Sequence, residues 1–588
     1  MLINGALWAT GLEDQIRPDG EIGFVGPFRP TTFGFKGHVK NVTVDDLRSL
    51  DGAIPPTPVA AKQLNAKSDR PNVLFIMSDD HTWQAIGAYQ SHLAGLNPTP
   101  NIDRLAAEGM RFNAAVCSNS ICTPSRAAIM TGQYAHQNGV LTLNDRLPVE
   151  RQILAHEMNA AGHQTAIIGK WHLKERPDAF DYYKVLPGQG KYFDPDFFEK
   201  GREGKQTVQG HSTDVITDKA LDWLTNDRDA SRPFFLKLHF KAPHDYYEYA
   251  PRYEDYLADV AIPEPSTLRH RGEGSIATRG YEGELSRVIA TSIGRRNWRR
   301  SYAADFDVSE SLSDDDALGE AYQIYLKKYL RCVKGVDDNL GRVVEYLRSN
   351  NLLDNTVIFY TGDQGFFLGE HDMQDKRWAY EPCMRMPLIV RYPKSIEGGV
   401  STDVIVENID FPATMLDFAG RDTLSEMTGR SFRSLLETGQ APDNWKRVAY
   451  YQYWMHMAHH DVPSHIGMRT ARHKLILFHG ESGGASWGKR ANVVTPPAWE
   501  LYDLKNDPLE QHNLANDPEH AELLARLQTR FSKLRNRVGA NDLSGVADAK
   551  VRQRMANVNL AIENAWDADR QSAIETSAAL KAELRPPG

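Results

Sequence analysis

The chain has 588 residues, which is more than one hydrophobic core usually supports, so we expect one large domain with smaller satellites. Hydrophobic residues make up 41% of it and charged residues 25%, and this ordinary composition excludes a wholly disordered protein. The net charge of -9 argues against a protein that coats nucleic acid, and no apolar run approaches the roughly 20 residues that span a bilayer.

Residues 1–70 differ from the rest of the chain because they are rich in glycine and proline. They contain a short alternating stretch at 33–44 and a proline- and alanine-rich stretch at 55–61. This pattern predicts an N-terminal extension, or the remnant of a β module, followed by a linker. Met1 is not followed by the basic and apolar regions of a secretory signal, which leaves a cytoplasmic protein, a removed signal and a truncated gene start open.

From Pro71 onwards, short apolar runs end in polar clusters. Each run has the length of a strand and is apolar almost throughout, which is typical of strands buried on both faces of a parallel sheet. Helical patterns lie between the runs, and the clearest covers residues 320–348. Strands that alternate with helices predict a doubly wound, mostly parallel α/β domain over residues 71–440. The five runs are NVLFIMSDDH, TAIIGKWH, PFFLKLHFKAPH, TVIFYTGDQG and MPLIVRYP.

After about residue 440 the pattern changes to short strands with the sequences RVAYYQYW, KLILF and WELYDL. An amphipathic helix is predicted at about 518–538. We therefore expect a smaller antiparallel α+β subdomain over residues 441–540, followed by a helical tail at 541–588.

Acidic and amide side chains directly follow two of the predicted strands. Asp79 and Asp80 follow one strand, and Asp363 and Gln364 follow another. Because the carboxyl ends of parallel strands meet at one edge of a sheet, these side chains can converge on one point. An all-oxygen set of this kind suits calcium or magnesium better than zinc. The alternative interpretation is a helix start at DDH and a turn at DQG.

Five cationic side chains lie within a few residues of a predicted strand end or helix start. If these five cations lie together at one edge of the sheet, they form a site for a tetrahedral oxyanion. Any one of them alone is more often a surface charge. The five are Arg126, Lys170, His172, His244 and Lys376.

The string CTPSRAAIMTG, from Cys122 to Gly132, resembles the signature of the type I sulfatases. The elements DDH, GKWH, APH and DQG occur in the order that these enzymes use, and the resemblance covers residues 71–540. It implies an alkaline-phosphatase-like fold, hydrolysis of sulfuric esters, and a formylglycine made from Cys122 by a maturation enzyme. It also implies one calcium ion per chain. The ligands of that ion would be Asp79, Asp80, Asp363, Gln364 and the formylglycine at position 122.

The resemblance also implies how the sulfate ester is attacked. The ion and Arg126 would favour the ionised hydrate of formylglycine, and one hydroxyl of that hydrate would attack the sulfur atom. Asp363 would take the proton of this hydroxyl. Lys170 and Lys376 would neutralise the sulfate oxygens.

Release of the two products would use histidines. His244, together with Lys376, would protonate the departing alcohol. His172 would then deprotonate the second hydroxyl of the hydrate, which expels sulfate and regenerates the aldehyde. An unconverted Cys122 would therefore leave the protein nearly inert.

The strings DAFDYYKVLPGQGKYFDPDF and STDVITDKALDWL resemble those of bacterial sulfatases that act on 6-O-sulfated N-acetylglucosamine in glycosaminoglycans or mucins. We therefore expect a sulfated carbohydrate as the substrate. Asp375, Arg377 and Trp378, beside Lys376, are candidate sugar contacts, although Trp378 fits core packing equally well. A substrate of this type favours a periplasmic or secreted protein. The sequence predicts neither the oligomeric state nor whether cleavage is exo or endo.

Two other functions stay open at this point. Relatives with the same fold and the same cysteine motif hydrolyse phosphonate or phosphate esters. Alternatively, the chain is a glycan-binding protein without catalysis, in which Cys122 is never converted. The relative turnover of sulfate and phosphate esters distinguishes a sulfatase from the first alternative. The mass of the purified protein tests the second alternative, because it shows whether Cys122 has been converted.

Overall fold

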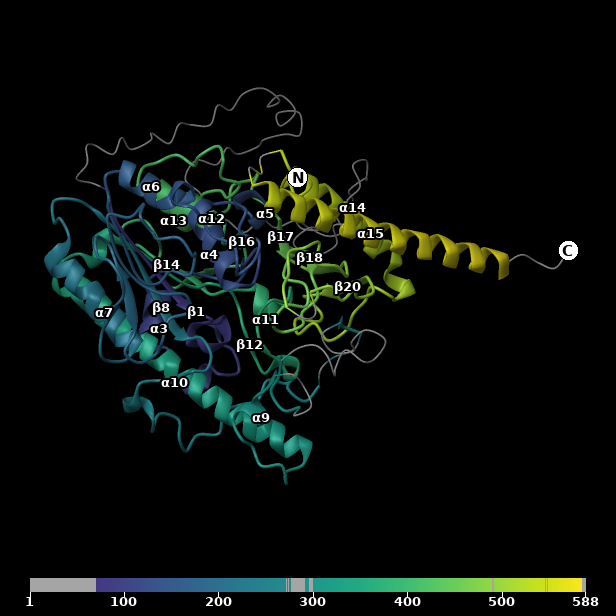
Figure 1. Ribbon diagram of the computed structural model, residues 1–588, viewed down its shortest axis with the longest axis horizontal. Helices are drawn as coiled ribbons and strands as arrows, with labels where there is room; N and C mark the ends of the chain where they lie inside the picture. The colour runs from purple at the N-terminus through teal and green to yellow at the C-terminus, as the bar shows by residue number, and fades with distance from the viewer. Residues whose placement is uncertain are drawn as a thin grey trace, which may run out of the picture. The chain divides into compact units, whose positions relative to one another are not determined.

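The computed structural model describes residues 70–270, 272, 274–276, 291–295, 300–488, 491–544, 546 and 548–583 (Figure 1). The described residues all belong to one compact unit. The extension and linker predicted over residues 1–70 lie outside the described residues, except for Arg70. None of the described helices is both long and apolar enough to cross a membrane.

The centre of the fold is a ten-stranded sheet whose five middle strands run parallel. In spatial order these are β11 (Thr356–Gly362), β1 (Asn72–Asp79), β8 (Phe234–Pro243), β4 (Gln164–Lys170) and β5 (Tyr182–Leu186). Beyond β11 follow β14 (Leu388–Arg391), β2 (Met110–Phe112) and β15 (Val400–Thr402), and beyond β5 follow β6 (Asp196–Glu199) and β7 (Gln206–Thr207). The predicted α/β class with a mostly parallel sheet is confirmed.

One predicted parallel strand has the opposite direction. The run MPLIVRYP forms β14, which pairs antiparallel with β11 in the register Ile358 to Arg391. The segment between the two strands contains only short elements, such as α11 (Glu381–Met384), and no long crossover helix. Parallel pairing needs a crossover that returns the chain to the starting edge of the sheet. Because this connection stays at the carboxyl edge of β11, the next strand runs back in the opposite direction.

Helices cover both faces of the sheet, and the alternation of side chains along β1 explains why. Leu74 and Ile76 point into one hydrophobic cluster, whereas Val73, Phe75 and Met77 point into another on the opposite face. Different helices close the two clusters (Figure 1). The first is covered by α3 (Pro100–Ala107), α7 (Ser212–Asp222) and α10 (Asp314–Ser349), and the second by α4 (Cys122–Thr131), α6 (Ile153–Ala160), α12 (Asp410–Phe418) and α13 (Arg433–Thr438).

Helix α10 is longer than the apolar periodicity predicts, because its start is set by polar residues. Ser313 caps the helix by accepting a hydrogen bond from the backbone N–H of Asp316. Three aspartates occupy the first turn, where the helix dipole favours negative charge. The helix therefore begins at Asp314, whereas the apolar pattern becomes visible only at residue 320.

The C-terminal part contains the predicted antiparallel sheet. Its strands are β17 (Val448–Tyr453), β18 (His465–Thr470), β19 (His473–Phe478) and β20 (Ala498–Asp503), paired in that order. The helix predicted at about 518–538 is α14 (Ala521–Arg537), and α15 (Ala549–Glu583) follows it. Helices α14 and α15 share a hydrophobic cluster with this sheet. The boundaries predicted at residues 440 and 540 stay predictions.

Shorter elements connect these parts. They are β3 (Ala115–Val116), α5 (Ala135–Asn138), β9 (Thr291–Ser292), β10 (Arg300–Ser301), α9 (Tyr302–Asp305), β12 (Phe367–Leu368), β13 (Gln374–Asp375) and β16 (Val406–Glu407). The segment between β11 and β14, which contains β12 and β13, carries several of the residues described next.

Candidate active site

The carboxyl ends of four adjacent parallel strands carry polar side chains that the sequence analysis singled out. Asp79 ends β1 and Asp80 follows it, Lys170 ends β4, His244 follows β8, and Asp363 follows β11. Because these strands are neighbours in the order β11, β1, β8, β4, their ends bring the side chains to one edge of the sheet.

Three carboxylates form the centre of this edge. One oxygen each of Asp79, Asp80 and Asp363 lies within 4.8 Å of the others, and all three side chains are buried. Gln364 donates from Nε2 to Oδ1 of Asp80 at 2.6 Å. Its Oε1 is buried and has no hydrogen-bond partner among the described residues. Three carboxylates and an unpartnered amide oxygen are the donor set that calcium prefers.

The electrostatics of the three carboxylates support a cation at this point. Burial raises the pKa of Asp80 to about 8, and repulsion from Asp79 and Asp363 adds to this despite the attraction of Lys376. Burial and Asp79 also raise the pKa of Asp363. Three close carboxylates repel one another in a buried site, so a divalent ion between them would favour the ionised form of each.

Three basic side chains surround the carboxylates. Arg126 donates from Nη2 to Oδ2 of Asp79 at 3.2 Å and to Oδ2 of Asp363 at 2.9 Å. Lys170 forms an ion pair with Asp79. Lys376 donates to Oδ2 of Asp80 at 2.6 Å. The cations therefore stand beside the acidic cluster, where they can also receive an oxyanion.

The same cations act on the pKa of Asp79. Burial alone would raise the pKa of this carboxyl, but Lys170, His244 and Arg126 together hold it well below its usual range. The ionised form of Asp79 is therefore favoured. The pKa values of Asp80 and Asp363 are raised instead, because the nearby cations do not offset their burial and mutual repulsion.

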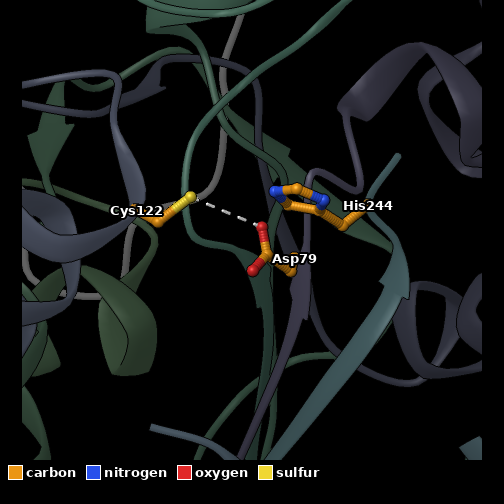
Figure 2. Close-up of side chains that lie close together, drawn as sticks. All are labelled: Asp79, Cys122 and His244. Carbon is orange, nitrogen blue, oxygen red and sulfur yellow. Dashed lines mark hydrogen bonds between the residues drawn. The ribbon is translucent and has the colours of Figure 1, made fainter. Parts of the chain in front are cut away.

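Cys122 is the first residue of α4 and points at this cluster. Its Sγ lies 3.7 Å from Oδ1 of Asp79, and Figure 2 shows the side chains of Cys122, Asp79 and His244 facing one another. Pro124 fits the first helical turn because its missing N–H would have no intrahelical acceptor there. Burial, followed by the charge of Asp79, raises the pKa of the Cys122 thiol. An unmodified thiol here stays protonated and is a poor nucleophile.

The two predicted histidines lie beside the cluster. Nε2 of His244 is 3.7 Å from Oδ2 of Asp80, and its Nδ1 is 2.5 Å from Oδ1 of Asp245. Burial, together with Lys170 and Lys376, lowers the pKa of His244 to about 4.

His172 is held next to position 122 through its backbone. Its carbonyl oxygen accepts a hydrogen bond from Oγ1 of Thr123 at 3.0 Å. Its Nδ1 is buried and has no partner among the described residues. Burial, together with Lys170 and Arg126, lowers its pKa well below the usual value.

The three candidate sugar contacts have different environments. Asp375 and Arg377 form an ion pair on either side of Lys376, and Nδ1 of His460 lies 3.2 Å from Oδ2 of Asp375. Trp378 is 1% exposed. Its ring stacks on those of Tyr380 and His465 inside a hydrophobic cluster, so its burial favours the packing interpretation. Asp375 and Arg377 thus flank Lys376 in the chain and pair with each other, whereas Trp378 lies in the core.

Residues that the sequence analysis did not identify also contact the site. Asp245 is next to His244, and an acid adjacent to a candidate histidine is a signal that the sequence did contain. Gln189 accepts a hydrogen bond from Nζ of Lys170 at 2.5 Å, and no local pattern marks it.

Tyr329 lies on α10, within the helical pattern that the sequence predicts over residues 320–348. Its hydroxyl donates to the carbonyl oxygen of Asp80 at 2.6 Å and accepts from the backbone N–H of Thr82 at 3.1 Å. Asp80 has a φ of 63°, in the left-handed region that a residue with a side chain rarely adopts. Tyr329 therefore holds the backbone of Asp80 in the conformation that aims its carboxylate at the cluster.

We expect Tyr329→Phe to weaken calcium binding by about tenfold, because Asp80 loses the contact that fixes its backbone. Calorimetric titration of calcium into protein that also carries Cys122→Ala measures the calcium affinity in the absence of turnover. Tyr325→Phe is the matched control, since its hydroxyl also lies on α10 but donates to the carbonyl of Phe367 at 2.7 Å. Equal calcium affinities in the two tyrosine variants would contradict the positioning role.

Comparison with known families identifies two matching models. The family described as Sulfatase matches residues 71–421, which include every strand of the parallel centre. A second model, described as N-sulphoglucosamine sulphohydrolase, C-terminal, matches residues 369–537.

Individual relatives cover most of the chain. An N-acetylglucosamine-6-O-sulfatase of Bacteroides thetaiotaomicron is 38% identical over 512 residues, which are 81% of this chain and 88% of that protein. The solved structure of BT4656 in complex with its substrate D-glucosamine-2-N,6-O-disulfate is 36% identical, with a TM-score of 0.70, and covers 82% of this chain and 100% of its own. The phosphonate monoester hydrolase of Silicibacter pomeroyi has a TM-score of 0.61 at 23% identity over 80% of this chain and 96% of its own, which shows a common fold alone.

Proposed function

This chain belongs to the sulfatase family, and on that basis we propose that it removes the 6-O-sulfate of N-acetylglucosamine in a sulfated glycan. The position of Cys122 carries the proposal, because its Sγ lies 3.7 Å from Oδ1 of Asp79. Asp79 belongs, with Asp80 and Asp363, to the carboxylate cluster at the strand ends, here called the strand-end cluster. The names of two relatives support the choice of 6-sulfated N-acetylglucosamine as the substrate. One is an N-acetylglucosamine-6-O-sulfatase, and the other was solved with a 6-O-sulfated glucosamine.

The proposed cofactors are one calcium ion and a formylglycine made from Cys122 by a maturation enzyme. The unpartnered Oε1 of Gln364 and the three convergent carboxylates support the ion. When present, the ion supplies positive charge beside the sulfate group, and hydrated formylglycine supplies a hydroxyl nucleophile. The ion would be held by Asp79, Asp80, Asp363 and Gln364, and its shell would be completed at position 122.

The basic side chains bind and orient the sulfate group. Nζ of Lys170 contacts Asp79 and Nζ of Lys376 contacts Asp80, so both ammonium groups flank the point where sulfate oxygens would lie. Arg126 holds Oδ2 of Asp363 through both Nε and Nη2, at 3.1 and 2.9 Å. This fixes the carboxylate of Asp363, which would accept the proton of a hydroxyl group at position 122.

Two histidines move the other protons. Asp245 lies against Nδ1 of His244, which leaves Nε2 to deliver a proton to the departing sugar oxygen. Nδ1 of His172 is unpartnered among the described residues, and Thr123 ties its backbone beside position 122. His172 is therefore the group proposed to take the proton of the second hydroxyl when sulfate leaves.

The sugar ring would be recognised beside Lys376. Asp375 and Arg377 offer an acceptor and several donors for sugar hydroxyls, and both lie in the segment that carries Lys376. Because the proposed substrate is a glycan polymer outside the cytoplasm, we also propose a periplasmic or secreted location.

A panel of sulfated sugars tests the proposed function. We expect 6-sulfated N-acetylglucosamine to release sulfate at least about tenfold faster, as kcat/KM, than its 3-sulfated and 4-sulfated isomers. Ion chromatography of free sulfate measures each rate, with protein expressed together with a formylglycine-generating enzyme. Faster turnover of another sulfated sugar would overturn the choice of sugar, and faster turnover of paired aryl phosphates would favour the phosphonate or phosphate ester alternative.

The glycan-binding alternative predicts a different result in the same experiment. A non-catalytic protein would release sulfate from no member of the panel and would keep the mass of an unmodified cysteine at position 122. A mass that shows an aldehyde at position 122, together with sulfate release, excludes the glycan-binding alternative.

A further inference from the structure

A cavity lies apart from the strand-end cluster of Asp79, Asp80 and Asp363. It has a volume of about 670 Å³ and is bounded by segments around Trp83, Thr267 and Arg385 and by Leu504, Pro508 and Leu509. It therefore adjoins both the loops of the ten-stranded sheet and the segment that follows β20. Within the described part of the chain, none of the proposed calcium ligands or catalytic side chains lines it.

Arg385 is the unusual feature of its wall. The central carbon of its guanidinium lies 3.9 Å from the centre of the Trp83 ring and 5.6 Å from that of Tyr89. Stacking of this kind engages the face of the guanidinium, but its five N–H donors lie in the plane and point outward from its edge. Among the described residues these donors have no hydrogen bond or ion pair, and Nε is buried. A cation at the cavity wall therefore lacks an acceptor.

The carboxylates of the same wall do not supply that acceptor. Oε1 of Glu381 accepts from Nε of Arg469 at 2.8 Å and lies 3.0 Å from Nζ of Lys474, so it attracts Arg385 only through space and makes no hydrogen bond to it. The two other acids are each held by a side-chain amide: Gln84 donates to Glu370 at 3.1 Å, and Asn113 donates to Asp403 at 2.8 Å.

We propose that this cavity is a second binding site, in which Arg385 holds an oxyanion carried by a sugar. The planar fork of a guanidinium matches the two oxygens of a carboxylate or sulfate group. The volume suits a sugar ring, and Trp83, Pro265 and Pro382 provide apolar surface in the wall against which such a ring can pack. The choice of a sugar as carrier rests on the proposed function, whereas the need for an anion rests on Arg385 alone.

Calorimetric titration of the full-length protein with three small ligands tests this site. D-glucuronate carries both the ring and the anion, acetate carries only the anion, and D-glucose carries only the ring. We expect D-glucuronate to bind one site per chain, at least about tenfold more tightly than acetate, and D-glucose to give no measurable heat. None of the three is a sulfate ester, so the result is independent of whether the protein hydrolyses such esters.

Two variants assign the binding to this cavity. Arg385→Gln is expected to weaken D-glucuronate binding by about tenfold or more, since the paired N–H donors are lost. Ser266→Asp, at an exposed position of the wall, places a competing carboxylate there without touching Arg385 and is expected to weaken binding several-fold. Ser401→Asp makes the same change at an exposed position outside the cavity and is the matched control.

Each outcome decides the proposal. Weaker binding in Arg385→Gln and Ser266→Asp, with Ser401→Asp unchanged, supports it even if Arg385→Gln melts at a lower temperature. Unchanged affinity in Ser266→Asp and Arg385→Gln overturns it, as does the absence of D-glucuronate binding. Equal affinities for acetate and D-glucuronate would overturn the sugar component, and equal heats for D-glucose and D-glucuronate would overturn the anion component.

Discussion

Replacing Cys122 with alanine is expected to abolish sulfate release, with kcat/KM lower by about four orders of magnitude or more. The reason is that position 122 is the proposed source of the nucleophile, and an alanine can be neither oxidised nor hydrated. The helix should be unaffected, since alanine is a good helix former and the backbone bond from Ser125 N–H to Ile121 O remains. Ion chromatography of sulfate, at enzyme concentrations high enough to detect a residual rate, measures the loss.

The matched control for this variant is Cys332→Ala. Cys332 is also buried but lies on α10 in the hydrophobic cluster of the opposite face. We expect this variant to keep its activity and to lose stability by about 1 kcal/mol. Substantial sulfate release by Cys122→Ala would show that another residue is the nucleophile. Equal losses in both variants would indicate a structural effect instead.

Asp80→Asn is expected to weaken calcium binding by about 100-fold and to lower kcat/KM by about 1000-fold. The substitution removes one of three convergent carboxylates. It also removes the negative charge that Lys376 faces at 2.6 Å, so a buried ammonium group loses its anionic partner. Calorimetry in the Cys122→Ala protein gives the calcium affinity, and sulfate release in the otherwise unchanged protein gives kcat/KM.

Asp337→Asn separates this effect from the general consequences of changing a buried aspartate. The carboxylate of Asp337 accepts hydrogen bonds from the backbone N–H groups of Asn101 and Ile102 at the start of α3, at 3.0 and 2.8 Å. Its loss should lower stability by about 1 kcal/mol while calcium binding stays unchanged. If Asp80→Asn bound calcium as tightly as this control, the proposed ligand set would be wrong.

The parts of the site that could be predicted are those whose signal is local in the sequence. Asp79 and Asp363 directly follow apolar runs, and parallel strands bring their carboxyl ends to one edge, so convergence follows from the pattern. The string from Cys122 resembles the family signature, and that resemblance implies both the proposed nucleophile and the role of Arg126 one helical turn later. Neither inference needed a knowledge of long-range packing.

The parts that could not be predicted depend on contacts between distant segments. Tyr329 touches Asp80 across 249 positions of sequence, and its apolar spacing is that of any core residue of α10. The side-chain environment of Trp378 depends on strands β18 and β19, which supply His465 and Phe478 to its cluster. The direction of β14 depends on where its connection runs, and apolar runs carry no information about direction.

The most direct test measures sulfate release from 6-sulfated N-acetylglucosamine against the fraction of chains in which position 122 is an aldehyde. Preparations made with different amounts of maturation enzyme provide the range, and mass spectrometry of the peptide that contains Cys122 provides the fraction. We predict a rate proportional to the aldehyde fraction and no activity at zero conversion. A rate independent of conversion, or no sulfate release from fully converted protein with calcium present, would contradict it.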